Sequence, residues 1–466
     1  MRELCDLGAR EAVAFLRAGD VRPADLIEAA LRRIDETDAA LNAMPTLCPE
    51  RALEHAARVP AGAPLAGLPI AVKDLNDVAG VRTTYGSPIF ADFVPEQSDL
   101  MVARLESRGA VVIGKSNSPE FGAGANTFNE VFGETRNPWD VLRTCGGSSG
   151  GSAVALATGQ VWLATGSDLG GSLRTPAGFC GVVGIRPSPG RVARSPGELP
   201  FDTLSVEGPM GRTVGDAGLM LDAMAGRDSR DPLSLEAPTD SFLAAAEAPS
   251  LPPRIAWSAD LGVTPVEQDV RAVCADAIER LAAAGARIDE AHPDMSPAPE
   301  AFHVLRAAGF VAGLGPLLED HRELLKPDVV WNIEVGLAMP ADRLGAAERA
   351  RGAVHAAMTG FLESYDVLIC PSACVAPFPV ETRWPRQVDG VAQETYIDWL
   401  RITSAITLTG CPVVALPCGL NADGVPIGLQ LVGRPHGEHA LLSAAAAVEE
   451  ILGFAEMLPV RPLRSG

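Results

Sequence analysis

The segment Thr144-Cys-Gly-Gly-Ser-Ser-Gly-Gly-Ser-Ala153 decides the fold. It holds four glycines and three serines between apolar, alanine-rich stretches. Glycine lets backbone N–H groups and hydroxyls approach another group closely, so such a loop is typical of a binding or catalytic site. A second loop of this kind, Gly166-Ser-Asp-Leu-Gly-Gly-Ser-Leu-Arg174, follows a short apolar run. Upstream, Gly67-Leu-Pro-Ile-Ala-Val-Lys-Asp74 ends another apolar run on Lys73. We expect these three segments to form one site.

The composition limits the classes of function. With 466 residues, 47% of them hydrophobic and 21% charged, the chain can bury a large core. Its formal net charge of −21 disfavours binding to nucleic acid or to anionic lipid, which both depend on Lys and Arg. The N-terminus has no apolar signal core, and no uninterrupted apolar run reaches the length of a membrane span. We therefore expect a cytoplasmic protein without a membrane or nucleic-acid partner.

The cysteines do not suggest a disulfide framework or a metal site. Nine cysteines are spread along a long chain, an odd number for pairing. Cys370-x-x-x-Cys374 has half of a zinc spacing, but no matching Cys/His pair follows it. His436 and His439 lie in a polar turn and are expected at the surface. The sequence predicts buried thiols and no metal or other cofactor.

Helical and strand patterns alternate along the chain, which indicates an α/β fold. A proline at position 23 opens a predicted helix over 24–36, and Thr264-Pro-Val-Glu267 is interpreted as a capping box for a helix running to about Ala284. Residues 187–209, rich in proline and arginine, are predicted to be ordered coil. Further helices are predicted over 98–108, 152–158, 216–224, 297–364, 396–409 and 438–451. Strands are predicted over 68–72, 110–114, 161–165, 254–257, 287–289, 365–370, 413–416 and 427–432.

Two chemical interpretations of the first loop fit poorly. Gly146-x-x-x-x-Gly151 begins like a phosphate-binding P-loop, but Ser152 stands where that motif requires lysine. Gly147-Ser-Ser-Gly-Gly151 satisfies the nucleophile-elbow pattern with Ser149 as nucleophile. That arrangement needs a downstream histidine, and nothing around His436 resembles a catalytic loop.

Several segments, in order, resemble the amidase signature family. They are the Lys73 segment, Gly146-Gly-Ser-Ser-Gly-Gly-Ser152, and the second loop with its continuation through Phe179-Cys-Gly-Val-Val-Gly-Ile-Arg-Pro187. The likeness returns at Tyr365-Asp-Val-Leu-Ile-Cys-Pro371 and Gly424-Val-Pro-Ile-Gly-Leu-Gln430, so it covers most of the chain. Taken singly, the serines favour turn hydroxyls or a helix N-cap, and Lys73 a surface residue after a strand. Their joint occurrence in this order favours the family.

The resemblance implies a Ser–cisSer–Lys triad with Ser172 as nucleophile, Ser148 as bridging serine after a cis peptide bond at Gly147–Ser148, and Lys73 as base. A serine hydroxyl is a weak nucleophile until a neighbour takes its proton, and an ammonium group cannot take it. Lys73 must therefore be neutral, and burial can lower a lysine pKa by several units from about 10.4. The apolar run before Lys73 is consistent with burial.

The resemblance also assigns residues around the triad. Leu169, Gly170, Gly171 and Ser172 match the family's oxyanion-hole segment, where consecutive N–H groups stabilise the charge of a tetrahedral intermediate. Gly122 corresponds to a residue that lines the substrate site in the fatty acid amide hydrolase branch. Supporting roles are expected for Ser149, Asp168 and Arg174, the latter two bracing the loops by hydrogen bonds.

The fold implied is a large twisted mixed β-sheet covered on both faces by α-helices. We expect one domain over 1–466, with its core at about 60–225 and 365–435 and a more variable, substrate-shaping helical region at about 290–400. The segments expected to shape the pocket are 121–132, 191–204, 302–331 and 370–399. Their aromatic residues suggest an apolar or aromatic substrate group.

The implied activity is hydrolysis of small apolar or aryl amides through an acyl-enzyme, with ester and carbamate hydrolysis as possible further activities. The family also includes the glutaminase subunit of an aminoacyl-tRNA amidotransferase, which delivers ammonia to a partner, and this alternative stays open. Homodimers are common among soluble enzymes, so a homodimer is a further expectation.

Overall fold

The computed structural model describes residues 3–195 and 199–461. Its centre is one mixed sheet of 11 strands in the order β1-β3-β2-β6-β8-β7-β14-β15-β11-β9-β10, as the α/β prediction requires. Strands β2, β3 and β6 pair in parallel, as do β9, β10 and β11, and the other pairs are antiparallel. The predicted fold class is confirmed.

The strands of the main sheet are mostly short and buried. They are β1 (Thr46–Leu47), β2 (Pro69–Lys73), β3 (Val111–Ser116), β6 (Leu163–Asp168), β7 (Val183–Arg186), β8 (Val206–Gly211), β9 (Ile255–Trp257), β10 (Ile288–Glu290), β11 (Val367–Pro371), β14 (Val413–Leu420) and β15 (Pro426–Val432). Two small hairpins lie outside it: β4 (Phe128–Asn129) with β5 (Gly133–Glu134), and β12 (Gln387–Val388) with β13 (Val391–Ala392).

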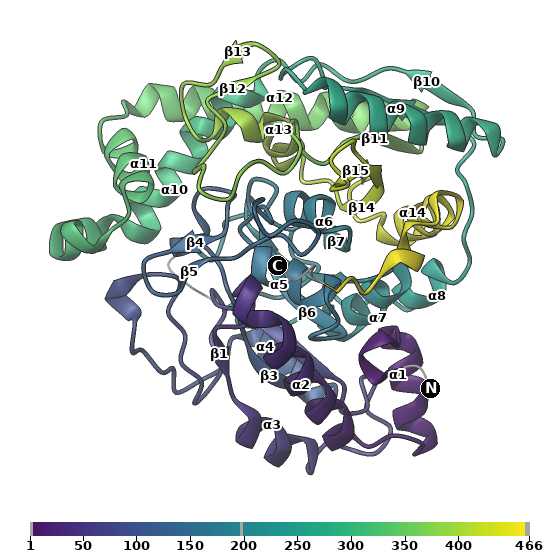
Figure 1. Ribbon diagram of the computed structural model, residues 1–466. Helices are drawn as coiled ribbons and strands as arrows, with labels where there is room; N and C mark the ends of the chain where they lie inside the picture. Colours follow the sequence, from purple (N-terminus) through teal and green to yellow (C-terminus); the bar gives the residue numbers. More distant parts are fainter. Residues whose placement is uncertain (1–2, 196–198, 462–466) are drawn as a thin grey trace.

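Helices cover the sheet, with α1–α4 in the lower part of Figure 1 and α9–α12 in the upper part. The α-helices are α1 (Ala9–Ala18), α2 (Pro23–Leu41), α3 (Pro49–Ala56), α4 (Leu100–Ser107), α5 (Gly150–Ala157), α6 (Arg174–Cys180), α7 (Val214–Met224), α8 (Phe242–Ala246), α9 (Gln268–Ala283), α10 (Ala298–His321), α11 (Pro327–Leu337), α12 (Ala341–Ser364), α13 (Arg401–Thr409) and α14 (Glu438–Leu452). Short 3-10 turns are Leu4–Asp6, Pro88–Phe90, Glu120–Gly122, Arg322–Leu324, Asp398–Leu400 and Phe454–Met457.

The two glycine–serine loops lie near each other, next to the strands β2 and β6 of the main sheet. The first loop leads into α5, which packs on β2, β3 and β6, and the second joins β6 to α6. Since β2 and β6 are parallel neighbours, Lys73 at the end of β2 lies beside the end of β6. The three segments singled out in the sequence therefore come together in one region.

Two predictions from the sequence are wrong. The first is the coil over 187–209, because residues from Val206 onward form β8 between β6 and β7. Proline is unfavourable in a central strand, and for this reason the presence of Pro209 led to a prediction of coil. In the structure, β7 pairs only with Met210 and Gly211 of β8. Pro209 therefore has no partner in β7, and the N–H that proline lacks is not needed on this side of β8.

The second wrong prediction is the capping box. Helix α9 begins only at Gln268, with Glu267 as its N-cap residue and no side-chain cap. The Thr264 hydroxyl donates to the Pro265 carbonyl instead, and the Glu267 carboxylate accepts the N–H of Ala376. A tertiary contact with a distant segment therefore replaces the local cap.

One helix is long and apolar enough to cross a membrane by length and composition alone, the span Ala298–Leu324 in the described part of the chain. Core helices of globular proteins pass the same test. The first half of α10 is packed inside the protein, with Phe302, Val304 and Leu305 all buried. The composition of α10 therefore gives no argument for a membrane location.

The tightness of the first loop can be tested at Gly151. A methyl group there would lie 2.3 Å from the backbone nitrogen of Asn117 and 2.7 Å from the Ala43 carbonyl oxygen. Alanine normally stabilises a helix relative to glycine by about 0.5–1 kcal/mol, but overpacking typically costs about 1–3 kcal/mol. We expect Gly151→Ala to lower the free energy of unfolding in urea by about 2 kcal/mol.

The matched control is Gly360→Ala in α12, where a methyl group would meet nothing within 4 Å. This variant should gain up to about 1 kcal/mol. Equal effects of the two substitutions would contradict the packing described here.

Candidate active site

Lys73 is the centre of the site. Its backbone N–H donates to Thr165 Oγ1 at 2.9 Å, which fixes the end of β2 against β6. Its side chain is fully buried, and Nζ lies 2.6 Å from Ser148 Oγ, 2.9 Å from Ser149 Oγ and 2.9 Å from Ser167 Oγ. A buried lysine amine thus contacts three serine hydroxyls.

Burial decides the protonation of Lys73. Removal from water disfavours the ammonium form and lowers the pKa of Lys73 to about 7, although the carboxylates of Glu207 and Asp168 act in the opposite direction. A neutral amine keeps one lone pair and can accept a proton from a hydroxyl. A neutral Lys73 amine is able to accept a proton near neutral pH. The burial itself agrees with the apolar run that precedes Lys73 in the sequence.

The first loop reaches Lys73 through an unusual backbone. The peptide bond between Gly147 and Ser148 is cis. Next to it, the Ser149 N–H donates to the Ser172 carbonyl oxygen at 3.1 Å, which joins the two loops. The Ser172 side chain is half-buried, and its Oγ has no hydrogen-bond partner in the ranges that the structure describes. Ser172 thus lies beside Ser149 without a hydrogen bond to Ser148.

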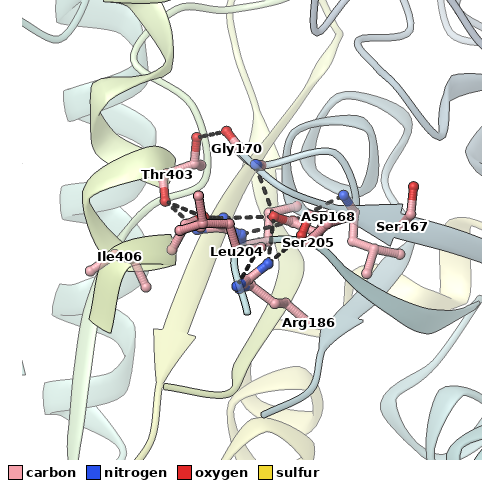
Figure 2. Close-up of polar contacts among 12 residues, drawn as sticks. Ser167, Asp168, Gly170, Arg186, Leu204, Ser205, Thr403 and Ile406 are labelled. Carbon is pink, nitrogen blue, oxygen red and sulfur yellow. Dashed lines mark hydrogen bonds and ion pairs between the residues drawn. The ribbon is translucent and has the colours of Figure 1, made fainter. Parts of the chain in front are cut away.

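Asp168 holds the second loop in shape. Its Oδ1 accepts the Gly171 N–H at 2.9 Å and its Oδ2 accepts the Leu173 N–H at 3.1 Å. Arg174 donates to both carboxylate oxygens, and Arg186 donates to Oδ1 and to the Asp168 carbonyl. Figure 2 shows these contacts converging on Asp168, while the Ser167 hydroxyl points away from them. Burial acts to raise the pKa of Asp168, but the charges of Arg174 and Arg186 outweigh it and hold this pKa well below its usual range.

The hydrogen bonds of Asp168, here called the Asp168 clamp, determine which backbone N–H groups of the second loop remain free to bind another group. The Gly171 N–H is already bound to Asp168. Among the described residues, the N–H groups of Leu169, Gly170 and Ser172 have no hydrogen-bond acceptor. Of the four residues expected to form an oxyanion hole, three thus have a free donor, and Gly171 contributes the turn, with φ of +119°.

The surroundings of the loops are mostly apolar. A methyl group on Gly170 would lie 3.0 Å from Phe302 Cζ and 3.9 Å from Leu400 Cδ1. On the side of Ser148, a methyl group on Gly122 would lie 3.1 Å from Leu75 Cδ1 and 3.3 Å from Ser148 Oγ. Gly122 therefore borders Ser148, and the nearest side chains to both glycines carry no charge.

Sequence reasoning missed two residues near Lys73. Ser167 directly precedes Asp168 at the end of β6, and its only signal was its place in the glycine–serine loop. Glu207 lies opposite Ser167 on β8, the strand that was predicted as coil. A correct assignment of β8 would have placed this carboxylate beside the site.

The remaining candidates lie elsewhere. His436 is exposed, and its backbone N–H donates to Ser188 Oγ. The Ser149 hydroxyl contacts Lys73 and not His436, so His436 is not a catalytic base for Ser149. Cys370 and Cys374 are buried free thiols, as are most of the nine cysteines. In the ranges that the structure describes, no group of three His, Cys, Asp or Glu side chains could hold a metal ion. Residues 196–198 of the expected pocket segment 191–204 lie outside the described residues.

The chain is similar to known amidases over nearly its full length. The profile of the Amidase family matches residues 25–442. An acylamidase of Rhodococcus erythropolis is 34% identical over 98% of this chain and 98% of its own. A glutamyl-tRNA(Gln) amidotransferase chain of Anaeromyxobacter dehalogenans, one of the subunits of that enzyme, is 36% identical over 97% of both chains.

A solved structure agrees with these relatives. The crystal structure of a bacterial aryl acylamidase that belongs to the amidase signature enzymes superposes with a TM-score of 0.90. It is 27% identical, and the match covers 98% of this chain and 99% of that chain. The fold, including the sheet that carries both loops, is thus shared with an aryl acylamidase.

The burial of Lys73 has a consequence for stability. An unfolded lysine titrates near 10.5, but the folded one titrates near 7, so folding disfavours the ammonium form. This destabilisation is fully present below pH 7 and disappears as the pH rises from about 7 to 10.5. We expect the stability of Lys73→Met relative to the wild type to be greatest at pH 6–7. The difference in the free energy of unfolding should fall by several kcal/mol towards pH 10, since each unit of pKa shift corresponds to roughly 1.4 kcal/mol.

Urea unfolding of both proteins between pH 6 and pH 10 measures this difference. Ser107→Ala, a change at an exposed residue of α4, is the control and should leave the pH dependence unchanged. A stability difference between Lys73→Met and wild type that does not depend on pH would show that Lys73 titrates normally in the folded protein.

Proposed function

The chain belongs to the amidase signature family and is a hydrolase of carbon–nitrogen amide bonds, and on this basis we propose that it cleaves small apolar or aryl amides through a Ser172 acyl-enzyme. The observation that carries this proposal is the buried Lys73 amine 2.6 Å from Ser148 Oγ. Amine and hydroxyl at this distance can pass a proton, and no other buried lysine in the described structure contacts a serine of the two loops.

The first half of the reaction forms the acyl-enzyme. Ser172 Oγ attacks the amide carbonyl carbon while its proton moves to Ser148 Oγ, and the proton of Ser148 moves to Lys73 Nζ. The lysine becomes an ammonium, and the carbonyl becomes a tetrahedral oxyanion. Nucleophile and base contacts are often longer in an unliganded enzyme and shorten when substrate binds, so we propose that Ser172 Oγ turns towards Ser148 in the complex.

The free N–H groups of the second loop suit the charge that develops. Leu169, Gly170 and Ser172 offer three backbone donors next to the nucleophile, while Asp168 uses the Gly171 N–H to fix the loop. Donors held in place before the reaction need no reorganisation, and losing one typically costs about 100-fold or more in rate. We propose these three N–H groups as the oxyanion hole, with Gly171 as its hinge.

The second half releases the products. The ammonium of Lys73 returns its proton through Ser148 to the amide nitrogen, the carbon–nitrogen bond breaks, and the amine leaves. Water then attacks the Ser172 ester and gives one proton to Lys73 through Ser148. That proton finally returns to Ser172 Oγ as the carboxylic acid departs.

The side chains packed around the two loops are mostly apolar, which favours an apolar substrate. Phe302 and Leu400 lie against Gly170, and Leu75 lies against Gly122. Trp399, the residue before Leu400, packs edge to face with Phe378 with ring centroids 5.6 Å apart. Such side chains bind alkyl and aryl groups by burial of apolar surface. Esters and carbamates of similar shape present the same carbonyl and are proposed as further substrates.

A second candidate is glutamine hydrolysis in an aminoacyl-tRNA amidotransferase, favoured by the 36% identity to an amidotransferase chain. Glutamine carries an ammonium and a carboxylate, and a site that selects it needs charged or polar partners for both. The side chains nearest Gly170 and Gly122 are Phe302, Leu400, Leu75 and Ser148, none of them charged. We therefore favour a stand-alone amidase. Action as a homodimer, a cytoplasmic location and the division of the single domain into a core and a more variable region stay predictions.

The nucleophile can be identified by substitution and trapping. Ser172→Ala should lower kcat on an anilide by at least about 10⁴-fold, because removal of a nucleophile disables the whole catalytic unit. Ser149→Ala, which removes one hydroxyl beside Lys73, should lose far less, about 10-fold. Mass spectrometry of a fluorophosphonate adduct should locate the label on Ser172. A label on Ser149, or full activity of Ser172→Ala, would refute the assignment.

Substrate class can be tested with a panel of anilides, aliphatic amides, carbamates and glutamine. We expect kcat/KM for the best anilide to exceed that for glutamine at least about 100-fold, since hydrophobic contacts of one ring are worth a few kcal/mol. Leu400→Ala should reduce kcat/KM for anilides more than for propionamide, which has less apolar surface to bury. A preference for glutamine together with co-purification of a partner would favour the second candidate.

A further inference from the structure

The site has an acidic neighbour that the mechanism has not used. Strand β6 lies between β2 and β8, and the register of the sheet places Glu207 of β8 directly opposite Ser167 of β6. Residues opposite each other in an antiparallel pair point to the same face, with Cβ atoms about 4.5–5.5 Å apart. Lys73 reaches the same Ser167 from the other flank, with Nζ 2.9 Å from its Oγ. Lys73 thus contacts the Ser167 hydroxyl from one flank of β6, and Glu207 lies beside Ser167 on the other flank.

Glu207 is buried and incompletely satisfied. The residue is only 9% exposed, and its Oε2 has no hydrogen-bond partner. No cation within 4.0 Å pairs with it in the described residues. A buried carboxyl group with one unpaired oxygen and no cation in contact is costly, so its presence beside Lys73 calls for a role. Burial raises the pKa of Glu207, whereas the charges of Arg194 and Lys73 and a hydrogen bond from Asn76 act to lower it.

The other charged groups near this pair are engaged elsewhere. Asp168 is on β6, but its carboxylate belongs to the clamp with Arg174 and Arg186 on the opposite face. Asp99, at the start of α4, acts to raise the pKa of Glu207, and its carboxylate accepts N–H groups of Asn76 and Asp77. Arg194 pairs with Asp202 at 3.5 Å. Among the described residues, Glu207 is thus a carboxylate beside Ser167 that forms no ion pair within 4.0 Å.

We propose that Glu207 is the acidic partner of Lys73, a positioning residue that stabilises the ammonium formed when Lys73 takes the proton of Ser148. This role deepens the proposed function and rests on it. The balance of the step is unchanged: the proton moves from Ser172 to Ser148 and from Ser148 to Lys73, and returns by the same path to the leaving nitrogen. Glu207 exchanges no proton in this path and acts by its charge.

The charge of Glu207 acts on Lys73 in a definite direction. A carboxylate near an amine favours the ammonium form, and burial opposes it, so the two effects set the pH at which Lys73 is neutral. Burial without Glu207 would make Lys73 neutral at lower pH, but also a weaker base. In the wild type the acid limb of kcat/KM should lie near the pKa of Lys73, about 7.

The test compares the acid limb of kcat/KM in Glu207→Gln with that of the wild type. The neutral isostere should move the limb to lower pH by about one unit or more and lower the plateau of kcat about 10-fold. Glu207→Asp, which keeps the charge, should leave the limb near its wild-type position. Glu449→Gln is the matched control, because Glu449 is a partly buried carboxyl on α14 that accepts the Val214 N–H far from Lys73 in the sheet. The acid limb of this variant should not move.

Other outcomes decide against the proposal. If Glu207→Gln and Glu207→Asp lose activity equally with an unmoved limb, Glu207 only supports the fold. Should the glutamine variant not fold, the size-matched pair Glu207→Asn and Glu207→Asp gives the same comparison. The rate of fluorophosphonate labelling of Ser172 against pH provides a second measurement without turnover. A label on another residue would refute the proposed nucleophile itself, whereas a label on Ser172 with an unshifted pH dependence would refute only the role of Glu207.

Discussion

The removal of one amine from water is the constraint on which the site depends. Lys73 Nζ lies among the hydroxyls of Ser148, Ser149 and Ser167, and the cost of burying its charge keeps the neutral form accessible near pH 7. The chain has only three lysines, Lys73, Lys115 and Lys326, and all three are buried. Lys115 differs in having a carboxylate in contact, Asp74 at 3.1 Å, and so forms a structural ion pair. The proposed base and the structural cation thus differ in whether a carboxylate is in contact with the amine.

The two faces of β6 carry different groups: one faces Lys73, and the other holds the second loop in place. On one face Ser167 meets Lys73, and Glu207 lies opposite it in the sheet. On the other face Asp168 binds Arg174 and Arg186 and holds the N–H of Gly171. Successive residues of a strand point to opposite faces, so Ser167 contacts Lys73 while its neighbour Asp168 holds the second loop. Arg174 continues from Asp168 to the carbonyl of Thr403 and to Gln430, which ties the second loop to α13 and β15. Distortion of the distant half of the sheet would therefore reach the loop through Asp168.

Much of this could be predicted from the sequence, and the failures have physical causes. The buried lysine, both loops and the α/β class followed from apolar runs that end in polar or glycine-rich turns, because those patterns are local. Strand β8 was missed because Pro209 disfavours a central strand, and only the pairing of β7 shows that its edge is free there. Glu207 was missed with it, since cross-strand neighbours are set by register and not by sequence distance. The helix start at Gln268 was displaced for a similar reason, a contact of Glu267 with Ala376 that lies far along the chain. The engagement of the Gly171 N–H by Asp168 likewise depends on the folded loop.

The most direct test is to titrate Lys73 itself. Labelling with ¹³C at lysine Cε gives three signals in this chain, and the one lost in Lys73→Met identifies residue 73. We predict that its chemical shift titrates with a midpoint near 7, as expected for an amine whose pKa is lowered by burial. A Lys73 signal that remains that of an ammonium up to pH 9 or above would contradict the claim that this residue is the base.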